Sequence, residues 1–303
     1  MFDPRYIAQA RLVLRCLTQL EKHPCFALKG GTALNLFVHD LPRISVDIDL
    51  TYLPLRPRDE SLDEIDRELQ AFGRDISDHT PRASIREQRV SERVVRLTVM
   101  TSEASIKIEP NLVFRGSVYP RELRPVCKAA QRAFEAFARV PCLAAADLYG
   151  GKLCAALDRQ HSRDLFDVKL LLEGTGITPG IRRAFVVYLA SHNRPMNELL
   201  RPNLLDISET FETQFVGMTE EHVALAELVE IQRRLPKELV SLLDEDERGF
   251  LLSLKRGEPN WTRLGLDHLE QLPALQWKLQ NIRKMDPVKQ RKMLERLQRI
   301  LDS

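Results

Sequence analysis

The chain has 303 residues, of which 44% are hydrophobic and 29% are charged, and its formal net charge at pH 7 is +2. This length is sufficient for two domains with a buried core, and the composition is typical of globular proteins. No apolar run approaches the ~20 residues of a membrane-spanning helix, and the balanced charge gives no general indication of a nucleic-acid-binding protein.

The cysteines and the first residues indicate a cytoplasmic protein. An odd number of dispersed cysteines without a C-x-x-C pair argues against both a disulfide framework and a zinc site. These cysteines are Cys16, Cys25, Cys127, Cys142 and Cys154. The segment MFDPRYIAQA lacks the charged and then apolar pattern of a signal peptide. We therefore expect a cytoplasmic protein with no membrane partner.

The first predicted elements are a helix and a glycine turn. Asp3 as the N-cap and Pro4 at the first helical position begin the helix, which apolar spacing extends to Glu21. Gly30-Gly31 then precedes a second predicted helix. Glycines at a helix entrance let backbone N–H groups approach an anion, and a helix N-terminus favours negative charge. Thr32 is predicted either to cap this helix or to bond a phosphate oxygen.

A strand that carries two carboxylates on one face is predicted over residues 44–50. Apolar residues occupy alternate positions from Ile44 to Leu50, and Asp47 and Asp49 lie between them. A period of two is typical of a strand with one buried face. Carboxylates held this close repel each other unless a cation lies between them. Mg²⁺ fits best, because it takes one or two protein carboxylates and completes its shell with water and phosphate oxygens.

These residues carry a resemblance to a known family. The pattern GGTAL…R-x-S-x-DIDL resembles the first motif of the AbiEii/AbiGii-type toxins, a branch of the polymerase-β-like nucleotidyltransferases that includes the MenT toxins. The resemblance implies an α+β fold: a polymerase-β-like core of a small mixed sheet with helices, followed by an α-helical C-terminal domain. It also implies two metal ions held over a nucleoside triphosphate.

A helix and a hairpin follow the strand that carries the two aspartates. Ser61 to Phe72 is amphipathic, and residues 93–100 and 104–113 are predicted to form a hairpin. If its second strand pairs beside residues 44–50, Glu109 falls on the face of Asp47 and Asp49. The resemblance implies a third metal-site acid here that accepts the nucleophile's proton. The alternative is that Glu109 is an exposed strand residue.

Two further predicted helices, over residues 143–157 and 164–172, carry a second motif. The pattern K-x-x-A…R…R-D-x-x-D falls on Lys152, Ala155, Arg159, Arg163, Asp164 and Asp167. By resemblance, Lys152 meets the triphosphate and Asp167 is a further essential acid. Asp164 and Asp167, three residues apart on one helix face, are placed to orient Lys152 or an arginine. The alternative is a set of salt bridges between the two helices.

The glycine-rich stretch from Gly174 to Gly180 is the predicted domain boundary. We expect a nucleotidyltransferase domain over residues 1–175 and a helical, acceptor-binding domain over 176–303. Helices are predicted over residues 181–189, 220–235 and 238–254, with a break at Pro236, and Asp286-Pro287 is expected to begin a last helix whose inward residues include Val288. The segment from Gly257 resembles the family's C-terminal signature, in which Trp261 and Trp277 are predicted core residues, with base-stacking platforms as the alternative.

The last residues of the chain are basic. The cations from Lys278 onward are Lys278, Arg283, Lys284, Lys289, Arg291, Lys292, Arg296 and Arg299, against Asp286, Glu295 and Asp302. Such a surface can follow a phosphate backbone. A solvated helix face is the alternative.

The predicted chemistry is metal-dependent nucleotidyl transfer. Asp47 and Asp49 are expected to hold Mg²⁺, with Mn²⁺ as an alternative, and Glu109 or a metal-bound water to take a proton. Lys152 is expected to stabilise the leaving pyrophosphate. The predicted phosphate-binding residues are Gly30, Gly31, Thr32 and Ser45, with Lys29 and Arg43 assigned either to the triphosphate or to the surface.

The resemblance also implies an acceptor and a partner. The family's mycobacterial members add pyrimidines to the 3′ end of tRNA and block aminoacylation, and a neighbouring antitoxin restrains the enzyme. We therefore expect an NTP, tRNA and a cognate antitoxin as partners. Two alternatives remain open: transfer of AMP to a protein or small molecule, and a non-catalytic nucleotide-binding partner.

Overall fold

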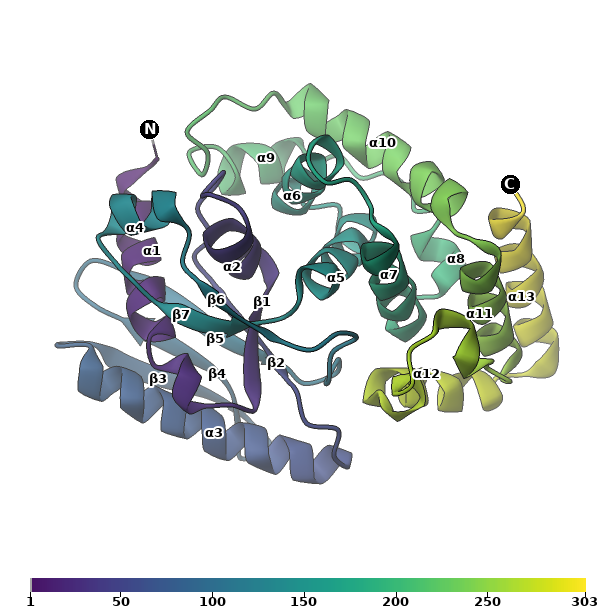
Figure 1. Ribbon diagram of the computed structural model, residues 1–303, viewed down its shortest axis with the longest axis horizontal. Helices are drawn as coiled ribbons and strands as arrows, with labels where there is room; N and C mark the ends of the chain where they lie inside the picture. Colours follow the sequence, from purple (N-terminus) through teal and green to yellow (C-terminus); the bar gives the residue numbers. More distant parts are fainter. Residues whose placement is uncertain (1) are drawn as a thin grey trace. The chain divides into compact units, whose positions relative to one another are not determined.

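The computed structural model describes residues 2–303, which form two compact units. One unit extends to Leu148 and includes Val216–His222, and the other comprises Tyr149–Phe215 and Val223–Ser303. Figure 1 shows the strands in the first unit and a succession of helices in the second. The division expected between residues 175 and 176 stays a prediction. No described helix combines the length and apolar character needed to span a bilayer.

The first unit is built on a seven-stranded mixed sheet, as described over residues 2–303, with the order β3-β4-β5-β2-β1-β7-β6. The strands are β1 Phe26–Lys29, β2 Ile48–Tyr52, β3 Ser84–Val90, β4 Arg93–Met100, β5 Ser105–Asn111, β6 Glu122–Pro125 and β7 Arg139–Cys142. Two of the neighbouring pairs, β2 with β5 and β1 with β7, are parallel, and the others are antiparallel. The mixed sheet expected from the sequence is therefore confirmed, and so is the β4–β5 hairpin.

Helices cover both faces of this sheet (Figure 1). They are α1 Pro4–Leu17, the short η1 Leu20–Lys22, α2 Gly30–Ala33 with its continuation η2 Leu34–Val38, α3 Arg58–His79 and α4 Lys128–Phe134. Tyr52 at the end of β2 donates a 2.5 Å hydrogen bond to Glu64 of α3, which places alternate β2 residues against that helix. Asp49 therefore lies on the opposite face of the sheet, the face of α2.

The helix entrances are determined locally. The Asp3 carboxylate accepts a 2.8 Å hydrogen bond from the backbone N–H of Arg5, and Pro4 occupies the first turn of α1. An N-cap of this kind satisfies one of the N–H groups that have no partner inside the helix. The Asp286 carboxylate does the same for the Lys289 N–H in α13. Both predicted helix starts are confirmed.

The strand predicted over residues 44–50 is displaced toward the C-terminus. β2 begins only at Ile48, because the backbone before it pairs elsewhere. Arg43 forms an isolated bridge with Thr219, and the Ile44 N–H donates to the Met218 carbonyl oxygen at 2.8 Å. The apolar alternation identified the buried residues correctly. The first residues of the predicted strand, however, form backbone hydrogen bonds with the distant segment around Met218 and not with a neighbouring strand.

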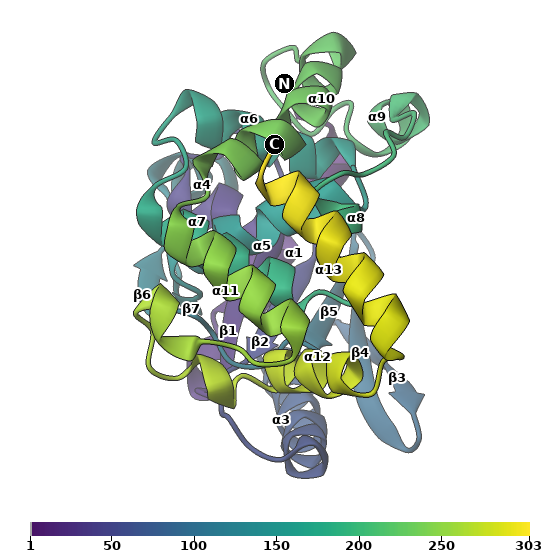
Figure 2. The same cartoon turned by 90° about the vertical axis from the view of Figure 1, so that its right-hand side faces the viewer.

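The second unit is helical. Its elements are the end of α5 Ala145–Asp158, then α6 Ser162–Glu173, α7 Pro179–Ser191, α8 Met196–Leu199, α9 Ser208–Gln214, α10 Leu225–Leu242, α11 Glu245–Arg256, η3 Trp261–Leu264, η4 Leu269–Gln271, α12 Pro273–Arg283 and α13 Pro287–Leu301. Figure 2 shows α13 packed along α11. The helical C-terminal part expected from the sequence is confirmed.

Three expectations for this unit are wrong. Pro236 lies inside α10 and does not end it, since Leu235 and Leu239 are buried on either side and their packing holds the helix through the proline. Trp277 is 57% exposed and Val288 is 61% exposed, so neither is a core residue. Trp261 does contact the core, with its ring centroid 6.0 Å from that of Phe250.

Candidate active site

Two charged side chains lie directly against the glycine turn. Gly30 has φ +73°, and a Cβ atom there would lie 2.6 Å from Asp49 Oδ2. A Cβ on Gly31 would lie 2.6 Å from Arg43 Nη2 and 2.9 Å from Ser45 Oγ. Any larger residue would have to displace these groups, and at Gly30 it would also be strained. The two glycines therefore let a carboxylate and a guanidinium approach the backbone.

Thr32 and Ser45 hold this turn from behind. Thr32 Oγ1 donates to the Asp47 carbonyl oxygen at 2.5 Å and lies 3.1 Å from Ser45 Oγ. Only 1% of Thr32 and 5% of Ser45 is exposed. Thr32 therefore ties α2 to the segment that leads into β2, and its predicted role as the helix N-cap is wrong, because Lys29 occupies the N-cap position.

Three charged residues form a row across the centre of the sheet. Asp49 on β2 is the register partner of Lys29 on β1 and of Glu109 on β5. Register partners on neighbouring strands point to the same face. The pairing of β5 beside β2 is confirmed, and it brings the carboxylates of Asp49 and Glu109 to one face. Asp47 lies two residues before Asp49, just outside β2, and all three acids are partly exposed.

Glu109 is also bound to a cation. Arg96 Nε on the adjacent strand β4 forms an ion pair with Glu109 Oε1, and the two side chains are 36% and 37% exposed. Sequence reasoning missed Arg96. The pairing of Leu97 with Ile108 brings Arg96 next to Glu109, and the sequence predicted the hairpin but not this register. The ion pair neutralises one of the predicted metal ligands.

The carboxylates near the glycine turn suit a hard cation that also binds oxygen atoms from outside the protein. Within residues 2–303, no three or more His, Cys, Asp or Glu side chains converge closely enough to hold a metal alone. The Asp49 carboxylate lies against Gly30, and the backbone of Asp47, two residues earlier in the chain, is bound by Thr32, so one or two carboxylates are provided near the glycine turn. Mg²⁺ commonly binds through so few protein ligands, with water and phosphate oxygens as the others. The residues therefore fit Mg²⁺ and do not fit a fully protein-enclosed zinc site.

Arg43 is a buried cation of this site. It is only 1% exposed, and its Nη1 donates to the Ile44 carbonyl oxygen at 3.0 Å. The surface alternative considered for Arg43 is therefore wrong. Lys29 is partly exposed at the end of β1. Two cations, Lys29 and Arg43, are thus close to the glycine turn together with the Asp49 carboxylate.

A second charged cluster lies in the helical unit. Lys152 Nζ on α5 contacts Asp164 Oδ1 at 2.7 Å and Asp167 Oδ2 at 2.9 Å, both on α6. The three side chains are 5%, 1% and 2% exposed. Arg159, which is 63% exposed, donates to Asp164 through Nε at 2.5 Å and Nη2 at 3.0 Å.

The charges of this cluster compensate one another. Burial acts to raise the pKa of the Asp164 carboxyl, but the charges and hydrogen bonds of Lys152 and Arg159 outweigh it, so the pKa lies well below its usual range. Asp164 and Asp167 orient Lys152, as expected from their spacing, and they also form the interhelical salt bridges considered as the alternative. The roles of Lys152 and Asp167 at a triphosphate stay predictions.

Comparisons with known proteins identify the family of the chain. Residues 11–281 match the family model described as "Nucleotidyl transferase AbiEii toxin, Type IV TA system". Among solved structures, the chain is similar to MenT4, a nucleotidyltransferase toxin from Mycobacterium tuberculosis H37Rv, with a TM-score of 0.58 and 19% identity over 91% of this chain and 93% of that one. At this identity the likeness shows a shared fold. A search of curated proteins by sequence gives no match.

Proposed function

The chain belongs to the AbiEii nucleotidyltransferase toxin family of type IV toxin–antitoxin systems, and on this premise we propose that it transfers a nucleoside monophosphate from a nucleoside triphosphate to the 3′ end of tRNA, which blocks translation. Membership of the family implies a cognate antitoxin. The triphosphate, the tRNA acceptor, the release of pyrophosphate and the dependence on Mg²⁺ are parts of the proposal.

One observation carries the proposal: the Asp49 carboxylate lies against Gly30, at a distance that leaves no room for a side chain there. In this proposal, the contact holds the carboxylate that would bind the metal next to the backbone that would receive the phosphates. Phosphoryl transfer depends mostly on positioning and on stabilising charge, so a rigid arrangement of this kind is what the reaction requires.

The other residues near the turn have complementary roles in the proposal. Backbone N–H groups of Gly30 and Gly31 receive the β- and γ-phosphates, while the buried Thr32 and Ser45 hold the turn in place. Lys29 and Arg43 supply positive charge beside it. Mg²⁺, or Mn²⁺ in its place, would be held by Asp47 and Asp49 and would neutralise charge on the phosphates.

Glu109, Lys152 and Asp167 complete the proposed set. The Glu109 carboxylate lies in the row with Asp49. Once its ion pair with Arg96 is broken, this carboxylate accepts the proton of the attacking hydroxyl. Lys152 neutralises charge that develops on the leaving pyrophosphate, and Asp167 holds its ammonium group in place.

The test is to incubate the purified protein with each α-³²P-labelled NTP and either total tRNA or total protein, with Mg²⁺ present. The proposal predicts label in the tRNA fraction, removable by trimming of the 3′ end, and no label when EDTA is added. Label only in the protein fraction would support AMP transfer to a protein instead. No transfer with any NTP would support a non-catalytic role.

A further inference from the structure

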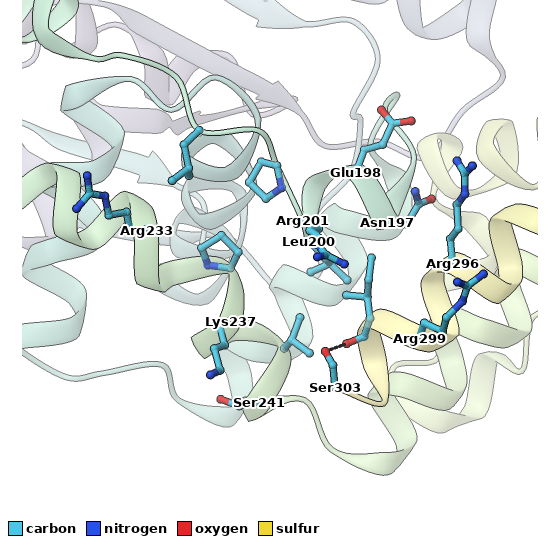
Figure 3. Close-up of a pocket in the computed structure, with 15 residues that line it drawn as sticks. Asn197, Glu198, Leu200, Arg201, Arg233, Lys237, Ser241, Arg296, Arg299 and Ser303 are labelled. Carbon is cyan, nitrogen blue, oxygen red and sulfur yellow. Dashed lines mark hydrogen bonds between the residues drawn. The ribbon is translucent and has the colours of Figure 1, made fainter.

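The helical unit contains a groove lined by cations. A depression of about 830 Å³ lies between α8, α10 and α13, and Figure 3 shows Arg233 and Lys237 on one side of it, Arg296 and Arg299 on the other, and Arg201 between them. Among the described lining residues, Glu198 has the only acidic side chain. The side chains of the lining therefore carry five positive charges against one negative charge.

The basic lining continues along α13. A second depression of about 560 Å³ shares Asn197, Glu198 and Arg296 with the first and adds Lys289, Lys292 and one acid, Asp286, whose carboxylate caps α13. Lys289, Lys292, Arg296 and Arg299 follow the spacing i, i+3, i+7 and i+10, so they form one stripe along the helix. At 1.5 Å per residue the stripe is about 15 Å long, which suits an extended, repeatedly charged ligand.

These cations have no carboxylate partners. Seven cations line the two depressions, and within residues 2–303 none of them forms an ion pair with another described residue. All seven are exposed: Arg201, Arg233, Lys237, Lys289, Lys292, Arg296 and Arg299. In the same unit, Lys169, Arg182, Arg194 and Arg263 are each paired with an acid. Unpaired like charges gathered in one groove repel one another, and an anionic ligand would remove this cost.

The structure separates this groove from the rest of the basic C-terminal sequence. Lys278 Nζ is bound by the carbonyl oxygens of His192 and Arg194 at 2.5 and 3.0 Å, and Arg283 Nε donates to the Gly257 carbonyl oxygen at 3.1 Å. These two cations have structural roles. Those on the α13 stripe remain available for a ligand.

The lining indicates contact with a phosphate backbone. Four of its cations are arginines, whose planar guanidinium groups match phosphate oxygens in pairs. No aromatic side chain lines either depression, as far as residues 2–303 are described, so bases would find no stacking platform. Leu204 and Val288 in the two linings are 50% and 61% exposed, so apolar surface also lies beside the cations, and the competition with poly-L-glutamate below tests an acidic peptide as the ligand.

We propose that this basic groove, formed by α8, α10 and α13, binds the phosphodiester backbone of RNA independently of sequence. The inference rests on the proposed function for the choice of RNA as the polyanion. It assigns binding of the RNA acceptor to named residues of the helical unit. The groove contributes affinity through contacts with RNA phosphates, as phosphate contacts do in other protein–nucleic acid complexes.

The test measures binding of fluorescein-labelled total tRNA by anisotropy between 50 and 200 mM KCl, on the full chain. The variant is Arg296→Gln/Arg299→Gln. The control, Arg291→Gln/Arg256→Gln, removes the same charge from exposed positions that line neither depression, with Arg291 on α13 but outside the stripe. Unfolding midpoints of all three proteins verify that they are folded.

We expect the groove variant to bind on the order of tenfold more weakly, with a slope of log K against log[salt] that is smaller by about 1.4 to 1.8, and the control to bind like the parent. Equal losses in the two variants would overturn the inference. Displacement of the tRNA by poly-L-glutamate at equal charge concentration would also overturn it, and would indicate an acidic protein as the ligand.

This outcome is independent of the proposed catalysis. Asp49→Ala is expected to abolish nucleotidyl transfer and to leave tRNA binding unchanged. Groove-dependent binding without any transfer would leave the inference intact and contradict the proposed function. Transfer to tRNA by a groove variant whose tRNA binding is unaltered would support the proposed function and contradict the groove inference.

Discussion

Asp49 and Glu109 are register partners on the parallel strands β2 and β5, and Glu109 is at the same time ion-paired with Arg96 on β4. One of the two neighbouring carboxylates is thus already neutralised by the protein, while the other faces the glycine turn. A metal ion at Asp49 would compete with Arg96 for Glu109. The strength of metal binding should therefore depend on a residue that does not itself bind metal.

Replacement of Arg96 by Gln is expected to lower the Mg²⁺ concentration that gives half-maximal transfer. A partly exposed ion pair contributes roughly 0.2–1 kcal/mol, so the shift should be up to about fivefold. Glu109→Gln should shift it in the opposite direction. Arg86→Gln, which removes an exposed charge from β3, is the control and should have no effect. An unchanged or higher half-maximal Mg²⁺ concentration in Arg96→Gln would contradict this account of the ion pair.

The conformation of Gly30 allows a test of the contact with Asp49. Gly30→Ala and Gly176→Ala place alanine at similar positive φ angles, +73° and +67°, but a Cβ at Gly176 meets no atom within 4 Å. Both should lose about 1–2 kcal/mol of stability to backbone strain. Only Gly30→Ala should also lose activity, on the order of a hundredfold, because Asp49 is displaced. Urea denaturation and transfer rates measure the two effects, and equal activities would refute the contact's importance.

Lys152 is expected to be essential for stability as well as for its proposed role. Lys152→Met leaves Asp164 and Asp167 buried without their ammonium partner, which should cost about 3–5 kcal/mol of unfolding free energy. In the control, Lys169→Met, the acids left behind are Glu173 and Glu227, which are 55% and 44% exposed. That loss should be about 1 kcal/mol or less. Similar losses in chemical denaturation would show that burial of the cluster contributes nothing.

The lowered pKa of Asp164 predicts how stability depends on pH. The folded-state pKa lies below the ordinary value of 3.8, so below about that pH the unfolded state binds the proton more readily. The contribution of Asp164 is therefore fully present above the ordinary value and is lost as the pH falls toward the folded-state value. Between pH 5 and 2.5, the unfolding free energy of the parent should fall more steeply than that of Asp164→Asn. Parallel curves would contradict the assignment.

The parts of the fold that could be predicted are those determined by neighbouring residues. Asp3 and Asp286 cap helices through N–H groups two and three residues away, and both helix starts were predicted. The beginning of β2 was not, because its preceding backbone bonds to Met218, far away in the sequence. The continuation of α10 through Pro236 likewise depends on burial of its apolar face against other elements.

The site shows the same division. Strand alternation placed Asp49 and Glu109 on one face, since register and period are local properties of paired strands. The sequence did not reveal that Arg43 is buried against Gly31, nor that Arg96 binds Glu109, because the direction of a long side chain depends on what surrounds it. The acids were therefore predictable, and their cation partners were not.

The most direct test of the central claim is the rate of NMP transfer to tRNA by Asp49→Asn, measured with labelled NTP at saturating Mg²⁺. Asp59→Asn serves as control, because the Asp59 side chain is 82% exposed on α3. The account predicts a loss of at least about a hundredfold for Asp49→Asn, with an unchanged unfolding midpoint, and the parent rate for Asp59→Asn. Equal transfer by Asp49→Asn and the parent would contradict it.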